Sequence, residues 1–154
     1  MRLIGPDRYT LTFNARRFDV RASDNRRKFA GRAARGDVKL YVFSSRGQPI
    51  YVGVTKQPMR NRLRYGWQAQ GRGGYYGYAF RKCLTEATLD IWYLDAPANV
   101  DHVVEAETIE AELVYLIRTL GQWPAYQTEI HFHPSQQVHH DLAASILRHY
   151  NVGF

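Results

Sequence analysis

The sequence contains one cysteine, Cys83, among its 154 residues. A single thiol excludes an intramolecular disulfide and any zinc site built from several cysteines. No apolar run approaches the roughly 20 residues that are needed to cross a bilayer, so no membrane association is expected. The first residues also lack the apolar segment of a secretion signal. These absences favour a cytoplasmic protein, and the length fits a single domain.

Acidic residues are scarce in the first half of the chain. Residues 1–82 hold 19 Lys or Arg and only four acids, a net charge of +15. Residues 83–154 hold two Arg and ten acids, a net charge of −8. A charge distribution this one-sided is typical of proteins that bind nucleic acid. A solvated basic surface is the plainer alternative.

Residues 1–37 are predicted to form a basic N-terminal arm, separate from the main core. Apolar residues alternate with threonines over residues 9–13, which indicates a short strand. A helix is expected over residues 25–35, with Ser23 or Asp24 as its cap. Most polar positions of that helix are basic, so we expect it to face nucleic acid.

The remaining chain predicts a core domain at 38–127, followed by a C-terminal strand and helix packed on it at 128–154. The expected elements are, in order, strands at 39–44 and 49–54 joined as a hairpin, a helix after Pro58, a strand at 88–94, and helices at 101–120 and 141–150. This order predicts an α/β (α+β) fold with a small three-stranded antiparallel sheet flanked by helices.

A glycine-rich loop at residues 71–78 interleaves arginine and tyrosine. Such a loop suits contact with a nucleic-acid backbone and with stacked bases. Packing of its tyrosines on the scaffold is the alternative. Together with the arm and the first helix, it supplies the predicted nucleic-acid-binding residues, which are Arg26, Arg27, Lys28, Arg60, Arg64, Arg72, Tyr75, Tyr76, Arg81 and Lys82.

One carboxylate lies within the apolar stripe of the long helix. At about 100° per residue, Glu110 falls between Ile117 and Val103. A carboxylate removed from water needs a cation, because an unpaired buried charge is costly. A metal ion or an arginine from the basic half would provide it. A position at the rim of the stripe, with the carboxylate reaching water, is the alternative.

Four short motifs occur in a fixed order, and the first of them has two halves. Leu40-Tyr41 is followed by Tyr51-Val52-Gly53, with the two tyrosines ten positions apart. Arg62-Leu63 comes next, within the helix after Pro58. Ile109-Glu110-Ala111-Glu112-Leu113-Val114 and Pro124-Ala125-Tyr126-Gln127 complete the series.

These motifs, taken together, resemble the GIY-YIG nuclease superfamily over roughly residues 38–127. The first motif lacks the glycine of the family, and Gln127 stands where the family has asparagine. The resemblance implies a metal-dependent endonuclease that hydrolyses DNA phosphodiester bonds. It implies catalytic roles for Tyr41, Tyr51, Lys56, Arg62 and Glu110, with Gly53 and Gln127 in support.

In this interpretation Glu110 binds a single Mg²⁺ or Mn²⁺ that keeps several waters, with Glu112 as the alternative ligand. Arg62 binds the scissile phosphate, and Tyr41 takes the proton of the attacking water. A tyrosine has an ordinary pKa near 10, so this base needs cations close by. Simple strand packing is the alternative role for both tyrosines.

A rival site lies further along the chain. Glu129, His131 and His133 alternate along residues 128–133, so a strand there would present all three on one face. Two histidines and a carboxylate could bind Zn²⁺, although a polar strand face is the plainer explanation. A third possibility is that one of these histidines assists catalysis or contacts a phosphate, so His131 and His133 are kept as supporting residues.

Three functions remain open at this point. The first is a restriction, defence or repair nuclease acting on DNA. The second is a non-catalytic nucleic-acid-binding module, and the third is a zinc-dependent hydrolase centred on His131 and His133. Cleavage of both DNA strands would require a homodimer or sequential nicking, and strandedness is not fixed by the sequence.

Overall fold

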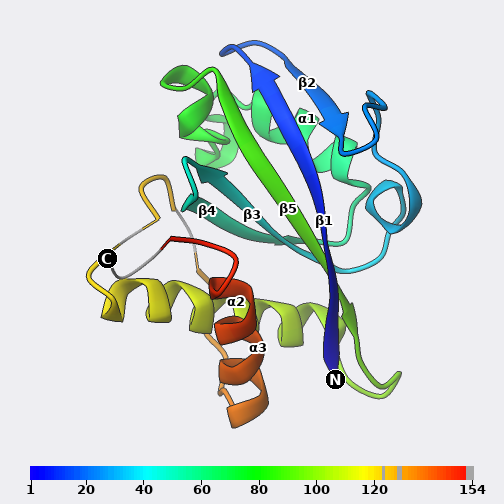
Figure 1. Cartoon of the computed structure of the whole chain (residues 1–154), viewed down its shortest axis with the longest axis vertical. Helices are drawn as coiled ribbons and strands as arrows, with labels where there is room; N and C mark the ends of the chain where they lie inside the picture. Colours follow the sequence, from blue (N-terminus) through cyan, green and yellow to red (C-terminus); the bar gives the residue numbers. More distant parts are fainter. Residues whose placement is uncertain (123, 128–129, 152–154) are drawn as a thin grey trace.

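The computed structural model describes residues 1–122, 124–127 and 130–151. Its central element is one antiparallel sheet with the strand order β2-β1-β5-β3-β4. Figure 1 shows this sheet running through the molecule, with helices on either side. The strands are β1 (Arg2–Phe13), β2 (Phe18–Ala22), β3 (Lys39–Ser45), β4 (Gln48–Thr55) and β5 (Glu86–Asp95).

The predicted three-stranded sheet is wrong, because the N-terminal region supplies two further strands. β1 pairs with β5 from Arg2↔Asp95 to Thr12↔Glu86, and β2 pairs with β1 on the outside. The alternation at residues 9–13 marks only the second half of β1. The first half is exposed or half-exposed and has a register shift between Ile4 and Asp7, so no regular pattern reveals it.

The helix predicted over residues 25–35 is also wrong. Asn25 has a positive φ of 68°, and only the 3-10 turn η1 (Gly31–Ala34) is helical in this region. The Asp24 carboxylate accepts a hydrogen bond from the Arg26 N–H, which favours a turn over a helix start. Phe29 is buried against Tyr9, with ring centroids 4.7 Å apart. The segment is therefore anchored to the sheet.

The hairpin of β3 and β4, the third strand and the long helix are confirmed. The α-helices are α1 (Met59–Gln68), α2 (His102–Thr119) and α3 (Gln137–Leu147). Two more 3-10 turns, η2 (Arg72–Gly74) and η3 (Ala79–Lys82), lie between α1 and β5. α3 begins four residues earlier than predicted, because Gln136 and His139 form a reciprocal cap at its start.

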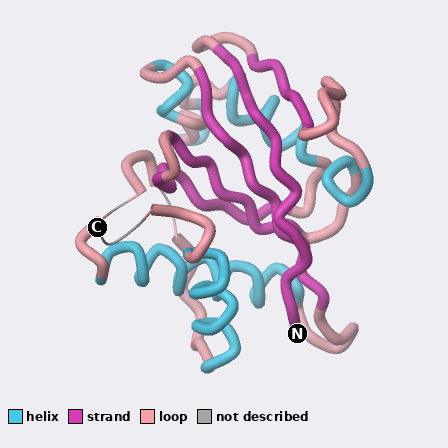
Figure 2. Tube along the Cα trace, viewed as in Figure 1, coloured by secondary structure: helices cyan, strands magenta, loops and turns pink. Residues whose placement is uncertain are grey.

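Each face of the sheet has its own apolar core. One core joins the sheet to α1 and η3 and is rich in aromatic rings such as Tyr41, Phe43 and Phe80. The other joins β3, β4 and β5 to α2 and α3 through Val42, Trp92 and the apolar stripe of α2. Figure 2 shows the helices on the two sides of the strands. α1 and α2 are thus held on opposite faces of the same sheet.

The strand predicted over residues 128–133 is wrong where the structure describes it. Thr128 and Glu129 lie outside the described residues, and the chain from Ile130 to Gln136 has no regular secondary structure. Alternation of polar and apolar residues had suggested the strand, but no strand pairs with the described residues from Ile130 to Gln136. None of the helices in the described part of the chain combines the length and apolar character of a membrane span.

Candidate active site

A pocket of about 140 Å³ lies at the edge of the sheet formed by β4. Its walls come from β3, β4, α1, α2 and the segment that precedes α3. The lining residues are Tyr41, Tyr51, Val52, Gly53, Val54, Arg62, Glu107, Glu110 and His131. Four predicted catalytic residues, Tyr41, Tyr51, Arg62 and Glu110, are therefore gathered in one place, together with the predicted supporting residues Gly53 and His131.

Gly53 allows the Tyr41 side chain to reach this pocket. Tyr41 lies on β3, one strand inside the edge, and is paired with Gly53 on β4. A Cβ atom on Gly53 would lie 2.5 Å from both Cζ and Oη of Tyr41. Real Cβ atoms do not come so close to other atoms, so only glycine leaves room for the ring. The Tyr41 side chain crosses β4 through this gap.

Tyrosine rings surround Arg62. The Arg62 guanidinium lies 5.0 Å from the centroid of the Tyr78 ring, and its Nη1 donates a hydrogen bond of 2.7 Å to Tyr75 Oη. The hydroxyls of Tyr41 and Tyr78 are hydrogen-bonded to each other at 2.9 Å. Tyr51 stacks on Tyr41 with ring centroids 6.2 Å apart. The guanidinium is therefore oriented before any ligand arrives.

The cation and the hydroxyls shift one another's pKa. Burial raises the pKa of Tyr41 well above its ordinary value, and Tyr78 and Tyr51 raise it further, while Arg62 acts in the opposite direction. Burial by itself lowers the pKa of Arg62, but the nearby tyrosines, Tyr41 foremost, outweigh burial and raise it. Arg62 is consequently a permanent positive charge. Tyr41 needs an additional cation in order to release its proton.

Tyr78 is a member of this site that the sequence did not single out. It belongs to the glycine-rich loop, and burial raises its pKa as well. A Cβ atom on Gly66 of α1 would lie 2.2 Å from the Tyr78 ring, so the ring packs directly on the helix backbone. A lone tyrosine in a flexible-looking loop carries no signal of such packing.

Two glutamates of α2 face the pocket. Glu110 is 4% exposed, which agrees with its predicted place in the apolar stripe. Glu107 lies one turn earlier and lines the same pocket. Its spacing of three residues from Glu110 was a signal that could have identified it. Glu112 points elsewhere, with its Oε2 3.5 Å from Nδ1 of His140 on α3.

Glu107 lies close to two of the predicted histidines. Its carboxylate oxygens are 3.7 Å from Nε2 of His131 and 3.4 Å from Nε2 of His133. The histidines thus gather around a glutamate of α2 without any strand. Glu129, the carboxylate with which they were expected to act, lies outside the described residues.

Gln127 completes the free edge of β4. Its Nε2 donates to the Val52 carbonyl at 3.0 Å, and its Oε1 accepts from the Val52 N–H at 2.7 Å. The side-chain amide therefore pairs with β4 as a neighbouring strand would. Next to it, the Tyr126 N–H donates to the Ile50 carbonyl. This segment fixes the part of β4 that carries Tyr51 and Gly53.

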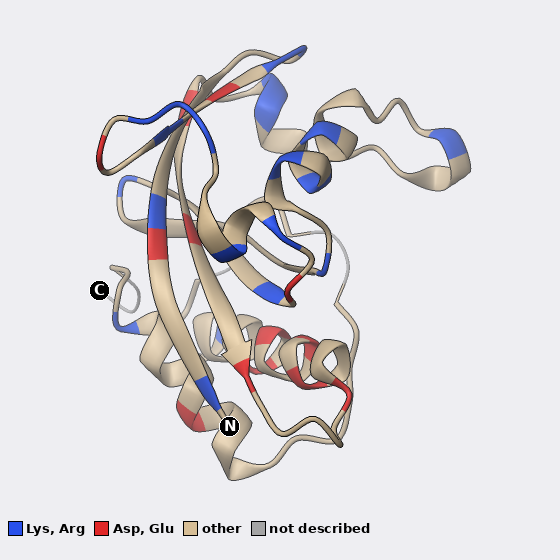
Figure 3. Cartoon of the chain, turned by 90° about the vertical axis from the view of Figure 1, so that its right-hand side faces the viewer, with Lys and Arg blue, Asp and Glu red and all other residues tan. Residues whose placement is uncertain are grey.

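The basic residues are distributed unevenly over the molecule. Figure 3 shows lysine and arginine concentrated around α1 and the neighbouring loops, whereas acidic residues gather on α2. Most of the predicted nucleic-acid-binding residues are exposed or half-exposed, namely Arg26, Arg27, Lys28, Arg60, Arg64, Arg72, Tyr75, Tyr76 and Lys82. The pocket is lined by Arg62 of α1 and by Glu107 and Glu110 of α2, and so takes residues from both regions.

Two predicted cations lie elsewhere than expected. Arg81 is buried and donates hydrogen bonds to the carbonyls of Tyr76, Tyr78 and Ala69. It therefore holds the glycine-rich loop against α1. Lys56 is exposed and does not line the pocket.

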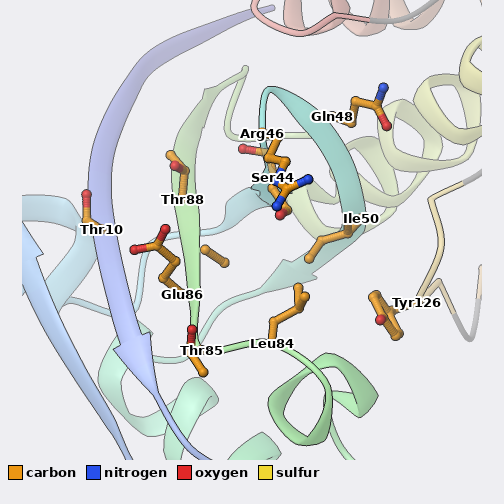
Figure 4. A pocket seen from close by; sticks show the side chains of 12 residues that line it. Thr10, Ser44, Arg46, Gln48, Ile50, Leu84, Thr85, Glu86, Thr88 and Tyr126 are labelled. Carbon is orange, nitrogen blue, oxygen red and sulfur yellow. The ribbon is translucent and has the colours of Figure 1, made fainter.

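A larger hollow of about 820 Å³ lies at the opposite end of β3 and β4. Figure 4 shows its side chains, which come from β1, β3, β4, β5, the turn between β3 and β4, the residues just before β5 and the segment containing Tyr126. Most are hydroxyls and apolar groups, and its two charged residues, Arg46 and Glu86, have opposite signs. It lacks the concentrated positive charge that a phosphate requires.

The carboxylates of the small pocket fit a hard divalent cation. Within the described ranges, no three histidine, cysteine or acidic side chains are arranged as a ready-made metal site. Mg²⁺ does not require one, since it typically binds to one or two carboxylates and retains several waters. Glu110, with Glu107 one turn away, supplies such oxygen donors in the pocket that also contains Arg62.

Comparison with protein-family models, with curated proteins and with solved structures gives no match for this chain.

Proposed function

We propose that this chain is a metal-dependent endonuclease that hydrolyses phosphodiester bonds in DNA. One observation carries the proposal. Tyr41, Tyr51, Arg62 and Glu110, which come from four different elements, line a single pocket. Their order in the sequence resembles the GIY-YIG nucleases, and the pocket supports this interpretation with geometry that is independent of the motifs.

Arg62 binds the scissile phosphate. A guanidinium offers a planar fork of donors that matches two phosphate oxygens. The hydrogen bond to Tyr75 and the Tyr78 ring fix the position of that fork. Because Arg62 is positioned in advance, it stabilises the extra negative charge that develops as water attacks phosphorus.

Glu110 would hold the divalent cation, with Glu107 as the neighbouring carboxylate. When bound there, Mg²⁺ or Mn²⁺ neutralises phosphate charge and stabilises the departing oxygen. Both glutamates lie on α2, on the other face of the sheet from α1 and Arg62. A phosphate at the β4 edge would therefore be contacted from two sides.

Tyr41 accepts the proton of the attacking water. The water oxygen forms a bond to phosphorus, the proton passes to the phenolate oxygen of ionised Tyr41, and the bond from phosphorus to the departing sugar oxygen breaks. That oxygen then takes a proton from solvent. Arg62 favours ionised Tyr41, and a cation at Glu110 would favour it further.

DNA is the proposed substrate because the pocket is lined by Arg62 of α1, around which lysine and arginine are concentrated (Figure 3). Lys82 and the predicted basic residues of the arm, α1 and the loop would follow the phosphate backbone on either side of the cut. We further propose a restriction, defence or repair role. Cleavage of both strands would then proceed through a homodimer or through two successive nicks.

The test is cleavage of supercoiled plasmid with Mg²⁺, Mn²⁺, Zn²⁺ or EDTA. Glu110→Gln and Tyr41→Phe remove one functional group each and nearly keep the volume of the side chain. Glu112→Gln is the matched control, since Glu112 lies on the same helix outside the pocket. We expect nicking with Mg²⁺ or Mn²⁺, loss of activity in the first two variants, and wild-type activity in the control.

Two outcomes would contradict the proposal. DNA binding without cleavage under any metal would favour a non-catalytic binding module. Cleavage that survives Glu110→Gln but requires Zn²⁺ would favour a zinc hydrolase at His131 and His133.

A further inference from the structure

A second pocket adjoins the catalytic arginine. It has a volume of about 480 Å³ and lies where the end of α1 meets the glycine-rich loop. Its lining residues are Tyr65, Gln68, Ala69, Gln70, Arg72, Gly73 and Tyr75. No sequence pattern predicted that the end of α1 and the glycine-rich loop lie against each other at this point.

Two tyrosines form a stacked pair in this pocket. The rings of Tyr65 and Tyr75 are nearly parallel, with 9° between their planes and 4.8 Å between their centroids. Tyr65 is 58% exposed, although an exposed aromatic ring is costly to keep in water. A flat ring pair with an open side is a surface on which a third planar group can stack.

The same pair is joined to the catalytic pocket. Tyr75 Oη accepts the hydrogen bond from Arg62, and the Arg62 guanidinium lies 5.9 Å from the centroid of the Tyr65 ring. A base and its own phosphate are separated by one sugar. A base stacked on this pair would therefore belong to a nucleotide next to the phosphate that Arg62 holds.

The rim of the second pocket suits a nucleobase. Gln68 and Gln70 carry amides that both donate and accept hydrogen bonds, as the edges of bases do. Arg72 adds a positive charge and can contact the adjoining phosphate. Both glutamines and Arg72 are exposed, so they are available to a ligand.

We propose that Tyr65 and Tyr75 form a stacking platform for an unpaired nucleobase next to the scissile phosphate. This proposal rests on the proposed nuclease function and specifies its substrate, which is DNA that is single-stranded or has an extruded base at the cut. A base inside an intact duplex is stacked on its own neighbours and cannot occupy the platform.

Binding is tested in EDTA, so that no cleavage is needed. The probes are two DNA duplexes that contain 2-aminopurine, one with this base bulged and one with it fully paired. Stacking on an aromatic ring quenches its fluorescence. Tyr65→Ala removes half of the platform, Tyr65→Phe keeps the ring, and Tyr115→Ala is the control, since Tyr115 is equally exposed on α2, at 60%.

We expect the wild type to bind the bulged probe more tightly than the paired probe and to quench it. Tyr65→Ala should weaken binding of the bulged probe by roughly tenfold to a hundredfold and abolish quenching, as loss of one stacking contact does. Tyr65→Phe and Tyr115→Ala should behave as wild type. Equal binding of both probes by the wild type, or unchanged binding by Tyr65→Ala, would overturn the platform.

The two proposals fail in different ways. Metal-dependent cleavage that is unchanged in Tyr65→Ala on both bulged and paired DNA leaves the nuclease intact and overturns the platform. Ring-dependent binding of the bulged probe without cleavage in any metal leaves the platform intact and overturns the nuclease.

Discussion

Gly53→Ala adds a single methyl group between β4 and the Tyr41 ring. The new Cβ atom would lie 2.5 Å from Tyr41 Cζ and Oη, whereas carbon atoms pack at about 3.5 Å. The ring must therefore move by about 1 Å. Tyr41 is completely buried, so its ring is enclosed by neighbouring side chains. A shift of the ring therefore also displaces the hydroxyl from its present position in the pocket.

The expected loss is larger for activity than for stability. Added volume in a packed core costs roughly 1–3 kcal/mol, and replacing glycine recovers about 0.4–1 kcal/mol by restricting the unfolded chain. The net destabilisation should be about 1–2 kcal/mol. A displacement of about 1 Å in a reacting group can lower a rate by about a hundredfold. We therefore expect folded protein with a rate about a hundredfold below wild type.

The assay is the initial rate of plasmid nicking, combined with thermal unfolding of the same samples. Gly36→Ala is the control, because its new Cβ would meet only the Lys56 carbonyl at 3.4 Å. Adding Gly53→Ala to Tyr41→Phe should cause little further loss of rate, since both changes act on one side chain. A wild-type rate in Gly53→Ala, or full additivity in the double variant, would refute the reasoning.

Three further predictions concern Tyr41, Lys39 and Gln127. If Tyr41 acts as the base, its raised pKa means that the nicking rate should increase about tenfold per pH unit between pH 7 and 9 without a plateau, and Tyr41→Phe should lose this dependence. Lys39 is buried with three carbonyl acceptors, and burial lowers its pKa to about 8, so the unfolded chain holds this proton more tightly than the folded one. The free energy of unfolding should therefore rise with pH between about 8 and 10.5 relative to Lys39→Met, as measured by urea titration. Gln127→Ala removes both hydrogen bonds to Val52 and should lower the melting temperature by roughly 2–8 °C, as measured by calorimetry, and an unchanged melting temperature would show that Gln127 does not stabilise the β4 edge.

The sequence predicted the local elements better than their assembly. The hairpin of β3 and β4 follows from two apolar runs around a turn, and α2 follows from its regular apolar spacing between Asp101 and Gly121. Pairing between β1 and β5 involves residues from 93 positions apart (Arg2↔Asp95) to 74 positions apart (Thr12↔Glu86). No local pattern encodes that pairing, and this is why two strands were missing from the predicted sheet.

The candidate site was predictable where a motif or a helical period pointed to it. The apolar stripe of α2 selected Glu110, and its burial agrees with that selection. Tyr78 and Glu107 were missed, because their roles arise from packing between separate elements. The histidine alternation was misleading, since His131 and His133 lie in irregular chain that contacts Glu107. Alternation indicates a strand only where a partner strand is present.

The position of β1 has a consequence for how the molecule folds. β1 lies between β2 and β5, so its inner partner is the last strand of the sheet to be synthesised. At cellular rates of translation, the chain between them takes on the order of ten seconds to emerge. During that time one edge of β1 stays unpaired, and the sheet cannot close in the order in which it is made. This high contact order predicts slow folding after synthesis, with the basic first half dependent on the acidic second half for its completion.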